Sequence, residues 1–182
     1  MRNKQLFLMM GAPGSGKSTW VRRQLRNNDV YVSRDIIRFA KLKPGDDYFK
    51  YEGEVFSEFA SLIVDALLDA NVERVFADAS HLNVRSRAQM LKAIEKEQER
   101  RERTALYDVN IIWLNTSLET CLKRNANREG RANVPDGTIT SMWKSQTLPR
   151  ANEGIRKVYI VSEKQNELLV VDYVKDENDF KF

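Results

Sequence analysis

The stretch that decides the fold is residues 6–19, which read LFLMMGAPGSGKST. Its first five residues form an unbroken apolar run, which predicts a buried β-strand. Gly11 to Ser18 fit the pattern G-x-x-x-x-G-K-[ST], and a helical pattern begins at Lys17. A glycine-rich loop between a strand and a helix is the context in which this pattern binds phosphates. The alternative, a glycine-rich turn that matches by chance, does not explain that context. The segment therefore predicts a site for a nucleoside triphosphate.

The residue types of this loop suit an anion for physical reasons. Glycines lack a Cβ, so neighbouring backbone N–H groups can converge on one anion. The first turn of the next helix adds its unsatisfied N–H groups and the positive end of its dipole. Lys17 supplies a mobile charge for the outer phosphates, and the Ser18 hydroxyl is placed to ligate Mg²⁺. We expect ATP and Mg²⁺ as cofactors, with the nucleotide held by Gly11, Ala12, Pro13, Gly14, Ser15, Gly16, Lys17, Ser18 and Thr19.

Length and composition bound the class of protein. The 182 residues are 42% hydrophobic and 31% charged, which is typical of one soluble globular domain covering 1–182 and not of a disordered chain. The net charge of +4 permits a polyanionic partner without requiring one. The single cysteine, Cys121, indicates a small hydrophobe in a reducing compartment. With no apolar run long enough for a membrane span, we expect a cytoplasmic protein with no membrane partner. Nothing in the composition indicates an oligomeric state.

Strand-like and helix-like segments alternate along the chain. This order predicts an α/β fold with three layers, in which helices flank a mostly parallel central sheet. Ligands bind such sheets at the carboxyl ends of the strands, so the residues that follow each strand are the first candidates for a site. A hairpin or a short helix fits 162–167 equally well. The expected strands are 5–10, 30–32, 72–77, 109–114, 157–161 and 168–174, and the expected helices are 17–27, 35–41, about 49–70, 84–103, 117–125 and 136–146.

The second expected strand is followed directly by Ser33-Arg34-Asp35 and then by Arg38. A carboxylate at a strand tip can face the γ-phosphate and accept a proton from an attacking hydroxyl. Arg38 is three residues farther on, so a helix starting at Asp35 puts both side chains on one face. A guanidinium there suits a phosphate on the acceptor. The alternative is that Asp35 caps the helix and Arg38 lies on the surface.

The third expected strand ends at Asp78 and is followed by Ala79-Ser80-His81-Leu82-Asn83. A carboxylate at this position is typical of residues that hold Mg²⁺ directly or through water, so Asp78 joins Ser18 as a predicted metal ligand. Ser80 or Asn83 is expected to cap the next helix. His81 is the only histidine in the chain, and no Cys/His cluster surrounds it. We interpret His81 as a loop residue behind the site or in touch with the acceptor.

Three arginines, Arg124, Arg128 and Arg131, follow the helix that begins near Ser117. A segment of this kind, about 124–135, can fold over the nucleotide as a lid. It would then supply charge to the transferring phosphoryl group and exclude water. The alternative is a solvated basic helix end that complements the helix dipole. We predict that Arg124 and Arg128 contact the nucleotide, and we make no choice for Arg131.

Four segments together resemble the kinase domain of the phage-type polynucleotide 5′-hydroxyl kinases. They are the loop from Gly11 through Trp20, the unit Ser33-Arg34-Asp35-Ile36-Ile37-Arg38, Asp78 with Leu82-Asn83, and the lid with the helix after it, residues 123–145. The loop is common to many kinases, whereas the Arg-Asp-x-x-Arg unit and the lid make the resemblance more specific. It extends from the N-terminus to about residue 150.

This resemblance implies a P-loop kinase fold with an arginine-bearing lid and transfer of the γ-phosphate of ATP to a 5′-hydroxyl end of DNA or RNA. It implies catalytic roles for four residues, with Lys17 at the nucleotide, Asp35 as general base, Arg38 at the acceptor phosphate and Arg128 in the lid. It also implies nucleic acid repair in a bacterial or phage-infected cytoplasm. The chain departs from the pattern by an extra residue near His81 and by Glu129 before Gly130.

Two other functions fit the same scaffold, because a fold does not fix the acceptor. The first is a kinase of a small molecule, such as a nucleoside, an antibiotic or a sugar nucleotide as in zeta-type toxins. A positive groove that reaches the site would favour a polymer instead. The second is an ATP-binding switch that is not a kinase, for which the sequence shows neither a sensor region nor an effector domain.

Overall fold

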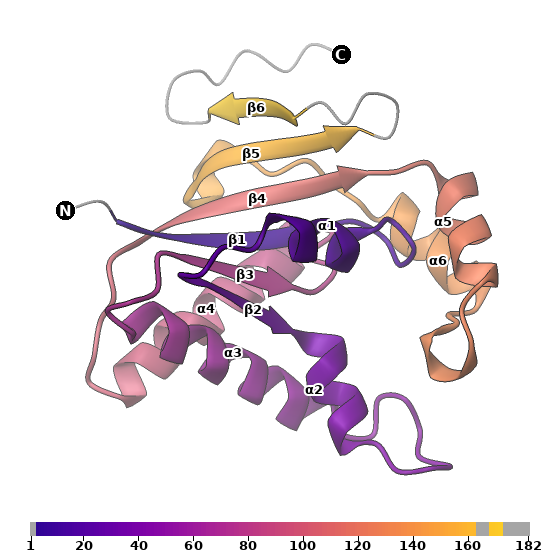
Figure 1. The fold of residues 1–182 in the computed structure, drawn as a ribbon, viewed down its shortest axis with the longest axis horizontal. Helices are drawn as coiled ribbons and strands as arrows, with labels where there is room; N and C mark the ends of the chain where they lie inside the picture. The colour runs from indigo at the N-terminus through magenta and orange to yellow at the C-terminus, as the bar shows by residue number, and fades with distance from the viewer. Residues whose placement is uncertain (1–2, 163–167, 173–182) are drawn as a thin grey trace.

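The structure is a computed structural model, and it describes residues 3–162 and 168–172. Its sheet has six strands in the order β2-β3-β1-β4-β5-β6. The first five of these run parallel, and β6 pairs antiparallel with β5. This confirms the mostly parallel sheet (Figure 1). The strands are β1 (Lys4–Met10), β2 (Asp29–Ser33), β3 (Arg74–Asp78), β4 (Tyr107–Asn115), β5 (Ile155–Ser162) and β6 (Leu168–Asp172).

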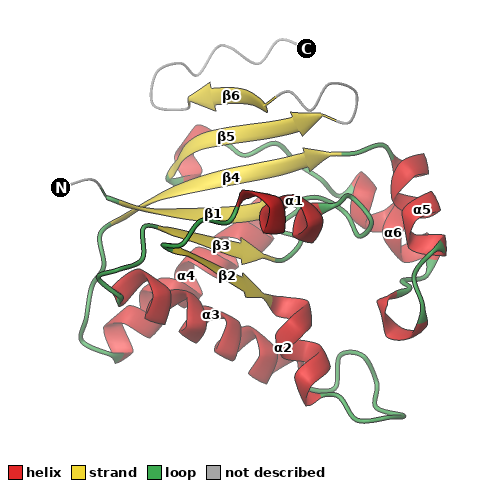
Figure 2. Ribbon diagram, viewed as in Figure 1, coloured by secondary structure: helices red, strands yellow, loops and turns green. Residues whose placement is uncertain are grey.

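Helices lie on both faces of this sheet and at one end of it (Figure 2). Two 3₁₀ turns, η1 (Gly130–Ala132) and η2 (Ala151–Glu153), complete the described elements. None of the helices among these residues is long and apolar enough to cross a bilayer. The helices are α1 (Lys17–Gln24), α2 (Arg34–Lys41), α3 (Glu52–Leu68), α4 (Val84–Arg100), α5 (Leu118–Ala126) and α6 (Asp136–Lys144).

The apolar run of β1 contributes side chains to both faces of the sheet, because successive side chains of a strand point in opposite directions. Leu6, Leu8 and Met10 join the larger core, which α3 and α4 cover. Phe7 and Met9 join a second core on the other face, which α1 covers. A strand buried on both faces must be apolar throughout, which is why the run is unbroken. The three-layer arrangement follows from this double burial.

The expected elements are all present, and their ends differ from the predictions where local turns intervene. α2 begins at Arg34, one residue early, because Ser33 is its N-cap and accepts from the backbone N–H of Ile36. α4 ends at Arg100, because Glu102 adopts a left-handed conformation with φ of 52°. β3 begins at Arg74, because residues 69–72 form a turn. Of the strand expected at 168–174, residues 173–174 lie outside the described part, as do 163–167.

The lid helices have a small core of their own. Cys121 of α5 and Ile139 of α6 are buried against Ala12 of the glycine-rich loop, which confirms Cys121 as a small core residue. Gly14 packs against the backbone of α5, where a Cβ would collide with the carbonyl of Cys121. Gly14 is therefore required for this close approach as well as for its φ of 83°. The packing fixes the lid helices beside the loop.

Candidate active site

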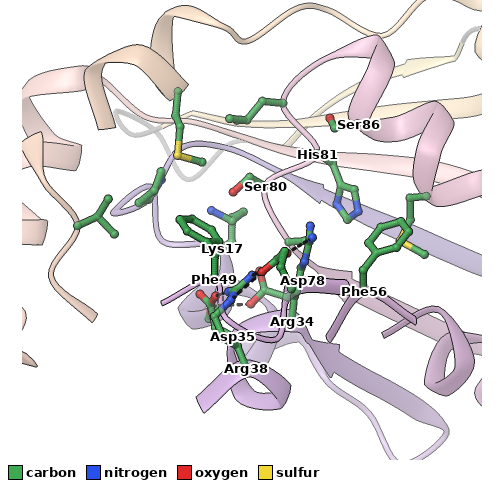
Figure 3. A pocket seen from close by; sticks show the side chains of 18 of the residues that line it. Lys17, Arg34, Asp35, Arg38, Phe49, Phe56, Asp78, Ser80, His81 and Ser86 are labelled. Carbon is green, nitrogen blue, oxygen red and sulfur yellow. Dashed lines mark hydrogen bonds and ion pairs between the residues drawn. The ribbon is translucent and has the colours of Figure 1, made fainter. Parts of the chain in front are cut away.

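A cavity of about 880 Å³ opens at the carboxyl ends of β1, β2 and β3. Its lining joins the glycine-rich loop, α2, α3, the loop after β3, α4 and the lid (Figure 3). The predicted residues Lys17, Ser18, Asp35, Arg38, Asp78 and Arg128 all line this one cavity. Residues between Pro13 and Met142 are thus brought together from distant parts of the chain.

The glycine-rich loop forms the first half of the cavity, which we call the donor half. Gly11, Gly14 and Gly16 all have positive φ, at 149°, 83° and 96°. Gly16 is the N-cap of α1, and no side chain caps this helix. The N–H groups of the first helical turn are therefore open to an anion. Pro13, Gly14, Gly16 and Thr19 line the cavity, whereas Gly11, Ala12 and Ser15 lie behind it.

The donor set of this loop fits a triphosphate. The Lys17 ammonium donates to the carbonyls of Gly11 (2.8 Å) and Ala12 (3.1 Å), which holds it over the loop. Ser15 Oγ is buried and has no hydrogen-bond partner within the described residues. A buried hydroxyl without a partner costs free energy, which a bound phosphate nearby would offset. The loop thus combines free N–H donors, a cation and an unsatisfied hydroxyl.

Burial lowers the pKa of Lys17, and the charges of Asp78 and Asp35 oppose that shift. The charge of Arg128 adds to the lowering. Asp78, Asp35 and Arg128 therefore all lie within electrostatic reach of Lys17. Two cations and two carboxylates around one space are suited to a transferring phosphoryl group and its metal ion.

Ser18 and Asp78 meet as the sequence predicts. The Ser18 hydroxyl donates to Oδ2 of Asp78 at 2.5 Å, and Asp78 is buried. The Tyr31 hydroxyl donates to the same oxygen at 2.5 Å, a contact that the sequence did not reveal. Burial and the charge of Asp78 raise the pKa of Tyr31, so it stays a donor. Hydroxyl and carboxylate oxygens are ligands that Mg²⁺ accepts, with phosphates and water completing its shell, so these residues fit the ion.

The second half of the cavity, which we call the acceptor half, is built around Arg38. Its guanidinium is buried and pairs with both carboxylate oxygens of Glu52 on α3. Burial disfavours the charged form, but the hydrogen bonds that Arg38 donates to Glu52 hold the pKa of Arg38 above its ordinary value. Nη1 of Arg38 also pairs with Asp35, so the two side chains share one helix face as predicted. The alternative of a capping Asp35 and a surface Arg38 is wrong on both points. Ser33 is the cap of α2, and Arg38 is buried.

Glu52 is the residue of this half that sequence reasoning missed. It pairs with Arg34 as well as Arg38, so one carboxylate on α3 fixes two arginines of α2. Tyr48 adds a hydroxyl that lies 3.0 Å from Nη1 of Arg38 and 3.1 Å from Oδ1 of Asp35. The only signal in the sequence is a carboxylate within an amphipathic helical pattern, which does not identify a partner.

Aromatic side chains surround the exposed edge of Arg38. The guanidinium carbon lies 4.6 Å from the ring centre of Tyr48 and 5.9 Å from that of Phe49. Phe49 and Phe39 line the cavity although they are 63% and 39% exposed. Exposed aromatic rings beside a cation form a surface on which a flat ligand can stack.

The lid loop between α5 and α6 is tied to a single buried amide, Asn125. Its side chain donates to the carbonyl of Val134 (2.7 Å) and accepts from the N–H of the same residue (3.0 Å). Arg128 lies in the loop that this clamp closes and lines the cavity. Arg124 lies instead against the glycine-rich loop, 3.3 Å from the carbonyl of Ser15. The side chain of Arg131 is outside the described part of the chain.

The loop after β3 carries His81 into the wall of the cavity, where its side chain is buried. Asn83 caps α4 and forms a capping box with Ser86, which settles the choice of cap. Arg87, fully buried, donates to the carbonyl of His81 and pairs with Glu153. This ion pair joins the loop to the segment before β5.

Comparison with known families gives one match over most of the chain. The AAA_33 family, described as an AAA domain, matches residues 6–149. Among curated relatives, the adenylate kinase of Helicobacter pylori (strain ATCC 700392 / 26695) is 25% identical over 190 residues, covering 91% of this chain and 97% of that protein. Transcription factor bHLH140 of Arabidopsis thaliana is 25% identical over 161 residues, covering 84% of this chain. The chain spans only 15% of that plant protein.

Solved structures share the fold. A fungal RNA kinase superposes with a TM-score of 0.63 at 14% identity, covering 97% of this chain and 81% of the other. A chain of the Pnkp1/Rnl/Hen1 RNA repair complex gives a TM-score of 0.61 at 24% identity, covering 80% of this chain and 44% of the other. The fold is that of a P-loop kinase, and the named substrates of these relatives differ.

Proposed function

The chain belongs to the AAA_33 family, and on that premise we propose that it transfers the γ-phosphate of ATP to the 5′-hydroxyl end of DNA or RNA. The observation that carries the proposal is the acceptor half. A carboxylate, Asp35, and a buried guanidinium, Arg38, share one helix face in the same cavity as the phosphate-binding loop. A base beside a phosphate-binding cation is what a phosphorylated alcohol requires.

Bound ATP supplies the phosphoryl group, and Mg²⁺ offsets the charge on its phosphates. In the donor half, Lys17 and the open N–H groups of α1 hold the phosphates. Ser18 and Asp78 hold the metal ion, and Arg128 supplies positive charge from the lid. The lid packing around Cys121 keeps Arg128 close to this half, so closure needs little rearrangement of α5.

In the acceptor half, Asp35 accepts the proton of the attacking hydroxyl. Its carboxylate is held by Nη1 of Arg38 and by the Tyr48 hydroxyl, so its orientation is set before the acceptor arrives. Glu52 pairs with Nε and Nη2 of Arg38, and Nη1 lies between Asp35 and the Tyr48 hydroxyl. An acceptor phosphate that takes the place of the Tyr48 hydroxyl on Nη1 would lie next to the base, with the attacking hydroxyl at Asp35.

Two further features favour a nucleic acid over a small acceptor. Phe39 and Phe49 offer exposed rings for stacking beside Arg38. On α4, Lys92 and Lys96 line the same cavity four residues apart, on one helix face. Aromatic rings with a positive track are typical of single-stranded nucleic acid sites.

A kinase of a small phosphorylated acceptor is the second candidate. The adenylate kinase relative, which this chain spans almost fully, favours it. In that case Arg38 and Asp35 keep their roles, and the exposed aromatic rings contact a single ligand only.

One experiment separates the two candidates. The protein is incubated with γ-labelled ATP and Mg²⁺, with a 5′-hydroxyl oligonucleotide in one set and a panel of nucleosides, nucleotides and sugars in the other. We expect label on the oligonucleotide, on DNA or RNA or both. Label on any small molecule with none on the oligonucleotide refutes the first proposal. Label on a phosphorylated nucleotide supports the second candidate, and label on an unphosphorylated nucleoside or sugar refutes that candidate too.

A further inference from the structure

His81 faces the cavity but has no part in the mechanism above. Its Nδ1 lies 3.0 Å from the backbone carbonyl oxygen of Met9. A carbonyl can only accept, so Nδ1 carries the hydrogen. In a neutral ring, Nε2 is then a bare acceptor, and it makes no hydrogen bond within the described residues.

The ring stays neutral at physiological pH. Burial lowers the pKa of His81 to about 4, and the positive charges of Arg34, Lys17 and Arg87 act in the same direction. The hydrogen bond to the Met9 carbonyl opposes the shift but does not reverse it. Nε2 therefore remains an acceptor throughout the pH range in which the protein would work.

The position of this acceptor is fixed from several sides. His81 has a φ of 37°, an uncommon conformation for a residue other than glycine. Its carbonyl accepts from Arg87 at 3.3 Å, and its ring stacks on Phe59 with the ring centres 6.4 Å apart. Backbone conformations of this kind persist where the surroundings determine them, and they cluster at ligand sites.

The wall around His81 is mostly apolar. Leu82 and Met90 line the cavity and are buried, and Phe56 presents its ring beside the imidazole (Figure 3). Over that ring, 5.2 Å from its centre, lies the guanidinium carbon of Arg34. Nε of Arg34 is buried and has no hydrogen-bond partner among the residues described. One bare acceptor thus stands in an apolar wall, and one unpaired donor is buried close to it.

We propose that His81, Arg34 and Phe56 form a subsite for the nucleobase of the acceptor nucleotide, in which an N–H of the base donates to Nε2 of His81. A base has flat apolar faces and a polar edge, which this wall matches. Ribose and phosphate need more polar partners than it offers. The inference rests on the proposed function. It gives the enzyme a preference among terminal bases that Asp35 and Arg38 alone cannot produce.

The test compares wild type with His81→Phe on nucleotide acceptors that carry a 5′-hydroxyl and a 3′-phosphate. The set has the four bases in ribose and deoxyribose form, and an abasic deoxyribose analogue. In wild type we expect kcat/KM to differ among the bases by about tenfold, the size of one buried hydrogen bond. His81→Phe, which keeps an aromatic ring over Phe59, should remove that difference. The decrease in kcat/KM of His81→Phe relative to wild type should vanish with the abasic acceptor.

The subsite is overturned by equal kcat/KM for all bases in wild type, by an unchanged base preference in His81→Phe, or by a loss that persists with the abasic acceptor. A loss confined to ribose acceptors assigns the hydrogen bond to the 2′-hydroxyl and also overturns the base assignment. Absence of transfer in wild type to every nucleotide and also to the 5′-hydroxyl oligonucleotide refutes the proposed function itself, whereas transfer to the oligonucleotide alone overturns the mononucleotide subsite.

Folding is controlled separately. His81→Gln keeps an acceptor oxygen at the reach of Nε2, so it should retain most of the base preference. Melting temperature and KM for ATP are measured for both variants, and neither should change enough to account for a base-dependent loss. If His81→Gln loses the preference as fully as His81→Phe while remaining folded, hydrogen bonding at this position is not its origin.

Discussion

The two halves of the cavity are built in opposite ways. The phosphate-binding loop of the donor half is one continuous segment, residues 11–19, which offers mostly backbone N–H groups, and Asp78 and Arg128 join this half from elsewhere in the chain. The acceptor half comes from α2, α3 and two loops, and it is held by side-chain ion pairs that converge on Glu52. A backbone site depends on local sequence, whereas a side-chain site depends on packing. The donor half should therefore tolerate substitutions around it better than the acceptor half does.

The largest expected effect is on the lid. Arg128→Ala should lower kcat by about a thousandfold or more, because the charge it supplies acts on the transferring phosphoryl group. Arg128 is exposed, so melting temperature should hardly change. Lys123→Ala, an exposed cation on α5 outside the cavity, is the matched control and should be active. Equal losses in the two variants would mean that general positive charge, not the clamped lid loop, serves the donor half.

Next comes Asp35→Asn, which removes the base while keeping the shape of the side chain. Transfer should fall by a factor of about 100 to 10,000, and the affinity for ATP measured by titration should stay near wild type. This outcome would show that the acceptor half supports transfer without contributing to ATP binding in the donor half. Transfer at a near-normal rate would show that Asp35 only positions Arg38. Glu99→Gln on the outer face of α4 controls for loss of a carboxylate.

A smaller effect is expected for Arg38→Ala, which should raise KM for a 3′-phosphorylated acceptor by about 10- to 100-fold and leave KM for ATP unchanged. Because this variant leaves the Glu52 carboxylate with one partner fewer, it should also lose stability. Adding Glu52→Gln should recover only part of the melting temperature, because Arg34 loses its ion pair, and should not recover acceptor affinity. Recovery of both would make Arg38 a folding residue only. Arg23→Ala on the exposed face of α1 is the matched control.

The smallest effect concerns pH and stability. The pKa of His81 falls from the ordinary 6.5 to about 4 in the folded protein. Between these values the unfolded chain binds a proton that the folded chain does not. The free energy of unfolding is therefore unaffected by protonation of His81 above pH 6.5. It decreases as pH falls from 6.5 towards 4, by at most about 1.4 kcal/mol per pH unit. Denaturant titrations should show a steeper dependence of the unfolding free energy on pH in wild type than in His81→Phe, because the carboxylates with lowered pKa contribute equally to both. Parallel curves would contradict the buried neutral imidazole.

The sequence allowed much of the fold and the donor half to be predicted, because their signals are local. An unbroken apolar strand, a glycine pattern and a helix start identify the loop from Gly11 to Ser18. The residues at strand tips, Asp35 and Asp78, follow from the rule that ligands bind at the carboxyl ends of parallel strands. Element ends were shifted where single residues form caps or turns, as Ser33 and Glu102 do.

The partners of those residues could not be predicted, because their contacts join distant parts of the chain. Tyr31 meets Asp78 across 47 positions, and Glu52 meets Arg38 across 14. Neither spacing follows from a helical or strand period. His81 shows the same limit, since a lone histidine in a loop has no readable environment until Met9 and Phe59 surround it.

The sequence by itself predicted a binding site for a triphosphate, because its backbone donors and helix N-terminus are formed by residues that are adjacent in the sequence. Tertiary structure alone decided how the acceptor half is held. It paired Arg38 and Arg34 with Glu52, closed the lid loop on Asn125 and buried His81 as a neutral acceptor. The physical reason is that ion pairing and burial depend on which side chains meet in space. Contacts between residues that are distant in the sequence cannot be read from its local patterns.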